Sequence, residues 1–335
     1  MRLNIIKCGT PLFVNAALEK ININPYFEFQ KFYKKILTLA YQIERKETNF
    51  YEALKGVRLA RNRGEKVHLI RGCPIDREIP VFCNIDPLSD KYLRKKTFVG
   101  EGYLLLISLL TDSPLLAYET RNNGNFFHDV YAQEKYYFTQ TQKTDSDLYF
   151  HNDRTAHEVR ADYIYLLGMR CDSINHVETC YIDGYDVIAN LTESEQDWLR
   201  QPWFKTPFDA YSSDSNITQL SSSAHRILIE ENSFRYYDTR TTVLEGAPVE
   251  AWKALVALKN SLQISPKVRV CIQNQDLLMI PNQQGLHSRN IINLIDINKV
   301  RERYLLKTYN FSSKERMSIH NNHFSNGISG LVSEH

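Results

Sequence analysis

Apolar residues follow a helical spacing near the start of the chain. Between residues 25 and 65 they recur every three or four positions, as on one face of an α-helix: Phe27, Phe32, Ile36, Leu37, Ala40, Tyr41, Ala53, Leu54, Val57 and Leu59. Residues 66–98 are more irregular, with a strand-like run at 68–72 and prolines at positions 74, 80 and 87. A further helix is expected at about 99–111. We expect these helices to support a sheet rather than to supply chemical groups.

From Leu115 onward the pattern becomes that of β-strands, with short β-branched and aromatic runs separated by Asn, Gly, Asp and Ser. Two helices are expected to interrupt it. Thr192 and Glu195 have the spacing of a capping box, which predicts a helix running to about Arg200. Pro248 predicts the start of the other helix, whose expected apolar positions are Trp252, Leu255, Val256 and Leu258. The chain is therefore predicted to be mainly β with flanking helices.

Composition narrows the class of protein. The chain has 335 residues, of which 43% are apolar and 24% charged, as in an ordinary soluble enzyme. Its net charge of +2 comes from scattered Lys and Arg, so neither a nucleic-acid partner nor a membrane surface is expected. The N-terminus lacks the pattern of a signal peptide, and the longest apolar run, 103–110, is too short to cross a bilayer. Six widely spaced cysteines without a C-x-x-C pair favour a cytoplasmic location.

A candidate metal site stands out within the strand-rich part. His151-Asn152-Asp153 is followed about 130 residues later by His287. Residues two apart in a strand point to the same side, so His151 and Asp153 can reach one metal, with His287 coming from another strand. Two histidines and one carboxylate form the facial triad that holds Fe(II) and leaves positions open for substrate and oxygen. This set favours iron over zinc.

Other histidines near the pair have competing interpretations. His157 lies six residues beyond His151, too far along to share the metal, so a packing role or support for a ligand is expected. His128-Asp129 is a second His/Asp pair, but adjacent strand residues face opposite sides. Two wider alternatives also stay open. One is a ligand-binding protein without enzymatic activity, and the other is a zinc hydrolase with a bound water and a general base.

Three segments in the same order resemble the clavaminate synthase-like Fe(II)/2-oxoglutarate oxygenases. The run FHNDRTAHEVRADY at 150–163 is similar to the family's F-H-T-E strand followed by a second His and R-A-D-Y. DLLMIPNQQGLHSR at 276–289, followed by ERYLLKTY, resembles its D-L-L strand, its H-x-R motif and its R-W-L-x-R strand. LLAYETRNNGNFFHDVYA at 115–132 is a weaker match to its G-Y-x-x-E segment. The closest resemblance is to the free amino-acid hydroxylases acting on Arg, Asn or Lys.

The resemblance implies a double-stranded β-helix, or jelly roll, as the core. Residues 1–310 are then expected to form a single catalytic domain. Within it, 1–98 would be a mostly helical support packed on the sheet and 99–310 the jelly roll, with 204–230 as a candidate lid, because 207–225 are rich in Ser and Asn. Residues 311–335 are expected to be a polar, partly ordered tail.

The resemblance also implies Fe(II) with 2-oxoglutarate and O2 as cosubstrates. His151, Asp153 and His287 would be the iron ligands. The distal carboxylate of 2-oxoglutarate needs a cation, and a planar guanidinium matches it best. Arg303 aligns with the family's R-W-L arginine, although Arg301 fits the usual spacing better and would share its face of a strand. Thr179 is expected to add a hydroxyl contact to the same carboxylate.

A small-molecule amino acid is the implied substrate. Glu119 and Asp238 align with acidic family positions that face the substrate, and Arg289 resembles the H-x-R arginine that serves its carboxylate. An acidic lining would favour a basic amino acid, lysine first and arginine next. Because family halogenases lack the carboxylate ligand, Asp153 favours hydroxylation. Desaturation, or hydroxylation of a carrier-bound or peptide-bound residue, stays open, as does the oligomeric state.

Overall fold

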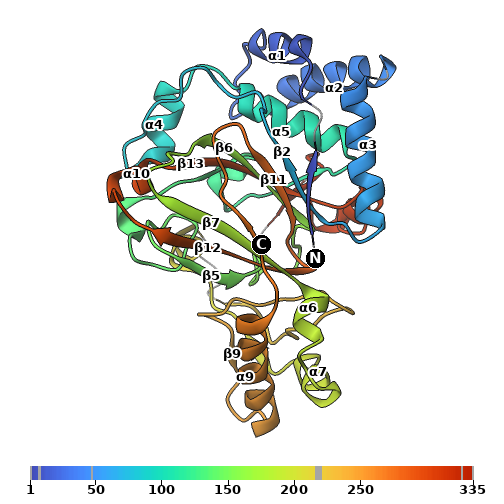
Figure 1. Ribbon diagram of the computed structural model, residues 1–335, viewed down its shortest axis with the longest axis vertical. Coiled ribbons are helices and arrows are strands. Elements are labelled where there is room, and N and C mark those ends of the chain that lie inside the picture. Colours follow the sequence, from blue (N-terminus) through green and yellow to red (C-terminus); the bar gives the residue numbers. More distant parts are fainter. Residues whose placement is uncertain (1, 7–8, 47, 216–220, 326, 334–335) are drawn as a thin grey trace.

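Two β-sheets face one another in the computed structural model, which describes residues 2–6, 9–46, 48–215, 221–325 and 327–333. The larger sheet has the strand order β1 (Leu3–Ile6), β2 (Val67–Ile70), β11 (Leu277–Pro281), β6 (Tyr163–Arg170), β13 (Tyr304–Asn310), β3 (Leu115–Tyr118) and β14 (Leu331–Val332), with β4 (His128–Val130) also paired to β13. The smaller sheet has the order β10 (Val268–Val270), β7 (His176–Asp183), β12 (Gly285–Asn293) and β5 (Leu148–His151). Figure 1 shows the smaller sheet lying across the larger one.

Strand alternation explains how the larger sheet separates two cores. On β6, Tyr165 and Leu167 pack toward the N-terminal helices, whereas Ile164 and Leu166 pack between the sheets. The inter-sheet core also includes Tyr181 from the smaller sheet. Because successive strand residues point to opposite faces, β6 and β11 have apolar residues at both parities and are buried on both sides.

The N-terminal helices cover the outer face of the larger sheet (Figure 1). They are α1 (Leu12–Glu19), α2 (Phe29–Arg45), α3 (Asn49–Asn62) and α5 (Val99–Leu110), with α4 (Pro87–Arg94) lying between α3 and α5 in the chain. The apolar spacing predicted α2, α3 and α5, and Phe32, Ile36 and Leu54 are buried as expected. Three residues assigned to the apolar face are instead exposed on the solvent side: Phe27, Tyr41 and Leu59.

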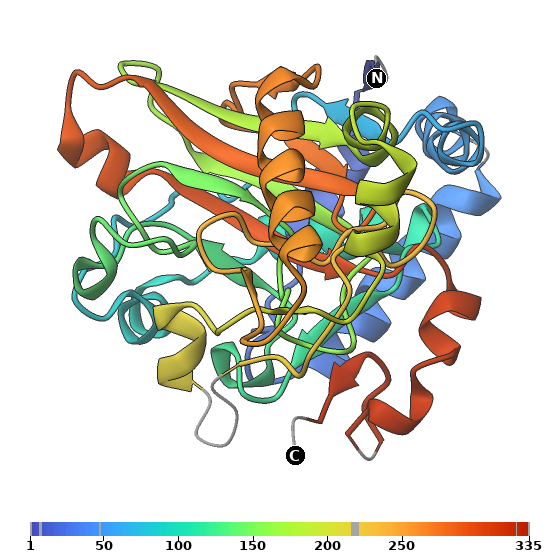
Figure 2. The ribbon, with the colours of Figure 1, turned by 90° about the horizontal axis from the view of Figure 1, so that it is seen from below.

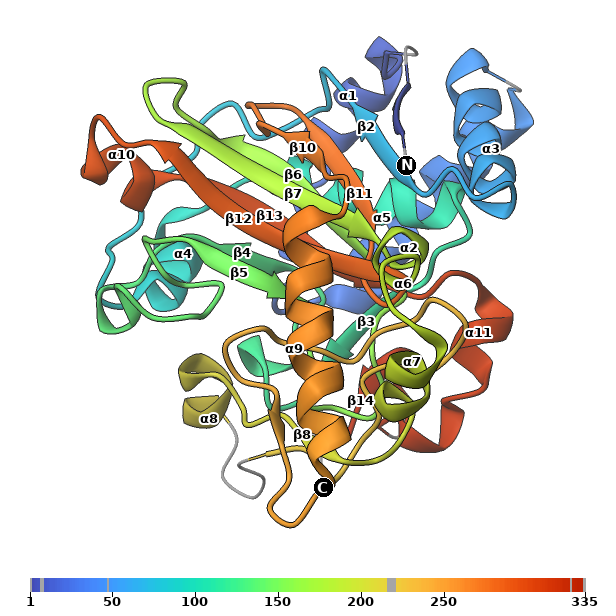
Figure 3. The same cartoon turned by 60° about the horizontal axis from the view of Figure 1, so that its bottom comes forward.

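A second group of helices packs on the outer face of the smaller sheet. It consists of α6 (Gly184–Ile188), α7 (Glu193–Leu199) and α9 (Val249–Ile264), and α9 lies across the strands in Figures 2 and 3. The capping box that begins α7 is confirmed, because Thr192 Oγ accepts from the Glu195 N–H and the Glu195 carboxylate accepts from the Thr192 N–H. On α9, Leu255 and Leu258 are buried, but Trp252 and Val256 face solvent, so half of the expected apolar face was wrong.

The remaining elements are short and lie in the connections. They are β8 (Phe204–Lys205), which pairs with β9 (Thr242–Val243), α8 (Ala210–Ser215), α10 (Ile297–Glu302), α11 (Lys314–Ser318) and three 3-10 turns at Asn122–Gly124, Glu134–Tyr136 and Asn321–His323. The C-terminal segment, expected to be a polar tail, adds β14 to the larger sheet, where Leu331 and Val332 are buried. In the described part of the chain, no helix is long and apolar enough to cross a membrane.

Candidate metal centre and adjoining pockets

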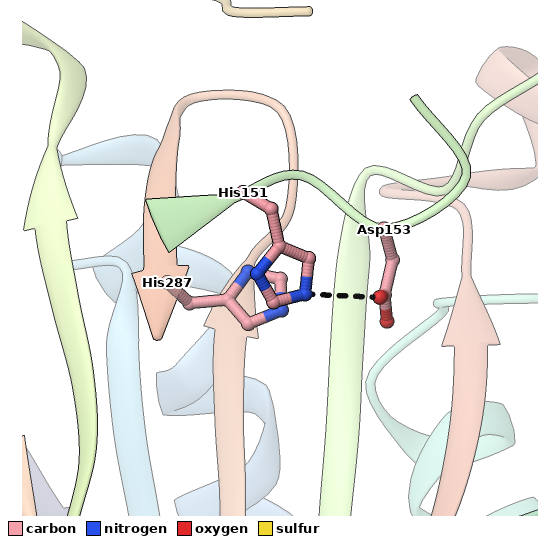
Figure 4. A group of neighbouring side chains, drawn as sticks. All are labelled: His151, Asp153 and His287. Carbon is pink, nitrogen blue, oxygen red and sulfur yellow. Dashed lines mark ion pairs between the residues drawn. The ribbon is translucent and has the colours of Figure 1, made fainter. Parts of the chain in front are cut away.

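His151, Asp153 and His287 come together at one point between the sheets (Figure 4). One ligand atom from each side chain lies within 4.8 Å of the others. His151 is the last residue of β5 and lies directly opposite His287 of the neighbouring β12. Asp153 follows the end of the strand, in a turn, so the prediction that it shares a strand with His151 was wrong. The turn still brings its Oδ1 to 3.4 Å from His151 Nε2.

A β-bulge fixes which side chains of β5 face this point. His151 pairs with His287 and Leu148 pairs with Arg289, so three steps on β5 match two on β12. An extra residue in one strand of a pair re-aims the side chains that follow it. As a result, Leu148 and His151 line the same pocket although they are three positions apart, which in a regular strand would place them on opposite faces.

Two buried asparagines brace the turn that contains Asp153. Asn152 Nδ2 donates to the carbonyl oxygens of Asn282, in the turn after β11, and of Gly285, the first residue of β12. Asn282 Oδ1 accepts from the Asp153 N–H at 2.7 Å, and its Nδ2 donates to the Asp153 carbonyl at 3.2 Å. The turn with Asp153 is therefore tied to the hairpin that leads into His287. Such supporting hydrogen bonds orient ligands in metal sites.

His287 and Asp153 have the protonation states that a metal requires, and a backbone hydrogen bond orients the ring of His151. His151 Nδ1 lies 2.8 Å from the Tyr149 carbonyl, so this nitrogen donates and Nε2 offers its lone pair. Burial, followed by the charge of His151, lowers the pKa of His287 to about 3. Burial alone would raise the pKa of Asp153, but the Lys307 ammonium holds it well below its usual range. A neutral imidazole beside an ionised carboxylate suits metal binding.

Lys307 is the residue of this centre that the sequence analysis missed. Its Nζ donates to Asp153 Oδ2 at 2.8 Å, to Tyr309 Oη at 2.9 Å and to Gln142 Oε1, and its side chain is buried. On β13 it shares a face with Leu305 and Tyr309, which belong to the inter-sheet core. A lysine at an inward position of an otherwise apolar strand was the available indication. Lys307 leaves Asp153 Oδ1 on the side of the two histidines.

These residues fit a bound divalent iron. His287 Nδ1 is buried without a hydrogen-bond partner, which is costly unless the nitrogen gains a ligand. Two histidines and one carboxylate are the donor set of the facial iron triad. A structural zinc site would need a fourth protein ligand, and the described residues offer three at this point.

A first pocket, the inter-sheet pocket, extends from the ligands between the two sheets. The ligands His151, Asp153 and His287 line it together with Lys307 and apolar residues of both sheets, and its remaining basic and hydroxyl groups come from Thr179, Ser288, Arg289 and Arg303. Arg303 is buried, and its Nη2 has no hydrogen-bond partner. Arg289 lies in this pocket opposite Thr179 in the β12–β7 register, and its expected contact with the substrate carboxylate stays a prediction.

Of the two arginines considered for the distal carboxylate of 2-oxoglutarate, the structure places only Arg303 in the inter-sheet pocket. Arg301 lies on helix α10, not on a strand, so the expectation that it shares a strand face with Arg303 was wrong. Its Nε donates to Asp145 Oδ2 at 3.1 Å and its guanidinium lies over the Tyr137 ring. Arg303, at the end of α10, lines the inter-sheet pocket. Burial, followed by the charge of Arg303, lowers the pKa of Arg289 to about 10, and both arginines line the same pocket.

A second pocket, the loop pocket, opens on the other side of the ligands. His151 and Asp153 line it together with residues 154–157, 206–209 and the side chains of Arg121, Ser212, Tyr237 and Tyr309. The Tyr237 ring stacks on His151 with centroids 4.9 Å apart. Residues 206–209 and 212 come from the segment predicted as a lid, so that segment forms one wall of the pocket. Whether it closes over a substrate stays a prediction.

Two residues expected at the substrate lie outside both pockets. Glu119 is exposed and its carboxylate accepts from Ser325 Oγ. Asp238 Oδ1 accepts from Tyr236 Oη at 2.6 Å and from Lys259 Nζ at 3.0 Å. Its chain neighbour Tyr237 faces the loop pocket instead. The acidic groups expected there are thus engaged elsewhere in the fold.

The two competing histidines are not brought into the ligand cluster. His157 lines the loop pocket and its ring stacks on Phe208 at 4.9 Å, as a packing role predicts. His128 lies on β4, where its Nδ1 is 2.9 Å from Asn122 Nδ2 and its ring contacts Tyr309. Neither belongs to the group of side chains that could hold a metal.

The fold and the site together define a jelly-roll protein with a 2-His-1-carboxylate cluster, as the sequence predicted. No family model and no curated protein matches the chain. Solved structures show the same fold. An asparagine oxygenase has a TM-score of 0.74 at 16% identity, with 99% of this chain and 98% of that chain covered.

Two further structures are of the non-heme iron oxygenase OrfP. One contains Fe and α-ketoglutaric acid, with a TM-score of 0.70, 16% identity and full coverage of both chains. The other contains Fe, succinate and (3S)-hydroxy-L-Arg, with a TM-score of 0.72 at 16% identity, covering 99% of this chain and 100% of that chain. At this level of identity the comparisons establish the fold.

Proposed function

We propose that this protein is an Fe(II)- and 2-oxoglutarate-dependent oxygenase that hydroxylates a free amino acid. The observation that supports this most directly is the content of the inter-sheet pocket. There, His151, Asp153 and His287 share one space with Arg303, whose Nη2 is buried and lacks a partner. A facial ligand set beside a buried guanidinium suits a chelating oxo acid with a distal carboxylate.

Each residue of this pocket then has a role. His151, Asp153 and His287 would hold Fe(II), while Arg303 and the Thr179 hydroxyl would bind the distal carboxylate. Arg289, on the same wall as Thr179, would add a second positive charge near the dianion. When bound, Fe(II) with 2-oxoglutarate and O2 supplies the oxidant that places oxygen on a C–H bond and yields succinate and CO2.

The chain itself shields and orients this chemistry. Leu148, Ile164, Leu166 and Leu305 form apolar walls of the pocket and exclude water. Asn282 holds the turn with Asp153, and Tyr237 stacks on His151, so two ligands are fixed before any metal binds. The loop pocket, which also reaches His151 and Asp153, would position the substrate.

Amino acids are the proposed substrate class because the neighbours of the same fold include an asparagine oxygenase crystallised with 3-hydroxyasparagine and OrfP with hydroxy-L-Arg. The preference for lysine or arginine depended on an acidic lining by Glu119 and Asp238. Both lie outside the loop pocket, and arginines line it instead. The basic amino acids are therefore not retained as favoured substrates.

The test is anaerobic reconstitution with Fe(II) and 2-oxoglutarate, followed by exposure to air with each free amino acid. We expect succinate release above the background for at least one amino acid, with a product one oxygen heavier by mass spectrometry. A product two hydrogens lighter would assign a desaturase. Absence of 2-oxoglutarate consumption with a correctly folded, iron-loaded protein would favour a ligand-binding or hydrolytic protein instead.

A further inference from the structure

Arg121 and Asp209 bring opposite charges to the loop pocket. Arg121 is 3% exposed, its guanidinium lies 3.6 Å over the Tyr211 ring, and its Nε is buried without a hydrogen-bond partner. Across the described ranges, Arg121 makes no ion pair. Because a buried charge without a counter-charge is costly, Arg121 offers a binding site for a negative group.

Ser212 fixes the spacing of the two charges. Arg121 Nη1 donates to Ser212 Oγ at 3.1 Å, and Ser212 Oγ donates to Asp209 Oδ2 at 2.8 Å. Asp209 Oδ1 accepts from the Ser212 N–H at 2.9 Å, so the first turn of α8 also holds this carboxylate. A guanidinium and a carboxylate are therefore fixed on one wall of the pocket, with a single hydroxyl group between them.

This wall lies close to the metal centre. The ligands His151 and Asp153 line the same pocket as Arg121 and Asp209. Burial, and then the charge of Asp209, raises the pKa of the Tyr237 phenol, and the ring of Tyr237 stacks on His151. A molecule held by Arg121 and Asp209 would therefore lie beside the side chains that would bind the iron.

We propose that Arg121 and Asp209 recognise the α-carboxylate and the α-ammonium of the substrate, so that the protein accepts a free amino acid. One cation and one anion held side by side match a zwitterion, whose two charged groups are bonded to the same carbon atom. A carrier-bound or peptide-bound residue has a thioester or amide in place of the carboxylate and would leave Arg121 buried without a counter-charge. This inference rests on the proposed function, because it assigns the binding mode of the same substrate.

The test is calorimetric titration of the protein, reconstituted anaerobically with Fe(II) and 2-oxoglutarate, with each of the common L-amino acids. The tightest binder is then compared with two analogues of nearly the same shape, its α-carboxamide and its 2-hydroxy acid. Without oxygen no turnover occurs, so binding is measured alone. We expect each analogue to bind about ten-fold or more weaker, because each loses a hydrogen bond between charged groups.

Two variants show which residue recognises which group, and each is the control for the other. Arg121→Gln should lose the preference for the free acid over its α-carboxamide but keep the preference for the amine over the 2-hydroxy acid. Asp209→Asn, which can still cap α8, should do the reverse. If both preferences were unchanged in both variants, the assignment of the two residues would be wrong.

Equal or tighter binding of the α-carboxamide or the 2-hydroxy acid by the wild-type protein would overturn the inference, and this result does not depend on any variant folding. Absence of binding by every free amino acid would overturn it as well, because they all carry the two recognised groups. Succinate release in air is scored separately. Selective binding of the free amino acid without succinate release would support the binding mode and refute the oxygenase assignment. Succinate release with the α-carboxamide alone would do the opposite.

Discussion

Replacing Lys307 with methionine tests the arrangement around Asp153 most sharply. The variant keeps a long, flexible side chain among Leu305 and Tyr309 but removes the ammonium that donates to Asp153 Oδ2 at 2.8 Å. The buried carboxylate is then left without its counter-charge in the metal-free protein. With a divalent metal bound to Asp153, the metal itself supplies the positive charge.

The expected loss follows from the contact. At 2.8 Å, two unit charges attract by about 6 kcal/mol at an effective dielectric constant of about 20. The net loss of stability is smaller than this attraction, because the variant no longer has to desolvate a buried ammonium. Breaking such a buried pair typically costs about 3–5 kcal/mol. At about 2.1 cal/mol/K per residue, the melting temperature of the metal-free protein should fall by about 4–7 °C.

The assay is chemical denaturation of four proteins in chelator: wild type, Lys307→Met, Asp153→Asn and the double variant. If the pair behaves as described, the double variant is much more stable than additivity predicts, with a coupling of about 3 kcal/mol or more. Added Co(II) should stabilise Lys307→Met more than wild type, because the metal replaces the missing charge. A coupling below about 1 kcal/mol would refute the reasoning, since exposed pairs reach only that value.

Three further substitutions test other parts of the structure. Arg303→Ala should raise the KM for 2-oxoglutarate at least thirty-fold, given about 2–5 kcal/mol for a buried charge pair, whereas the matched control Arg301→Ala should leave it unchanged; the reverse result would reassign the anchor. Asn282→Ala removes the acceptor of the Asp153 N–H and should lower Co(II) affinity in titrations about five-fold or more, by the 1–3 kcal/mol of an unsatisfied buried group; unaltered affinity would show that the turn keeps its conformation without Asn282. Burial, followed by the charge of Arg61, lowers the pKa of His68 to about 3. Between pH 6.5 and 3, His68 is therefore protonated in the unfolded chain but neutral in the folded protein. Unfolding free energy should therefore fall by up to about 1.4 kcal/mol per pH unit in that window, and a folded His68→Leu that showed the same slope by denaturation would contradict this role.

Much of the architecture could be predicted because periodicity and capping are local properties. The helices α2, α3, α5 and α7 follow from apolar spacing and from the Thr192 capping box. The exposed Trp252 on α9 shows the limit of this reasoning. An apolar residue at the right spacing is buried only if something packs over it, and local sequence does not say where the neighbouring element lies.

In the candidate site too, some residues could be predicted from the sequence and others could not. Motif order identifies His151, Asp153 and His287, and the pairing of β5 with β12 brings the two histidines together, while Asp153 joins them from the turn after β5. Glu119 and Asp238 lie outside both pockets because their directions depend on loops and on the C-terminal segment that pairs with β3. The substrate role of Arg289, on strand β12, stays a prediction. Lys307 and Arg121 act through contacts 154 and 91 residues away in the chain, to Asp153 and Ser212. No local pattern encodes contacts of that range.

The central claim is that His151, Asp153 and His287 bind Fe(II) in a pocket that also takes 2-oxoglutarate. The most direct measurement is the visible absorption of the anaerobic protein titrated with Fe(II) and then with 2-oxoglutarate, beside His287→Ala as a control. The account predicts that wild type develops the charge-transfer band of a chelated oxo acid on Fe(II) and that the variant does not. A folded wild-type protein that shows no band at saturating Fe(II) and 2-oxoglutarate, or a variant that shows the same band, would contradict it.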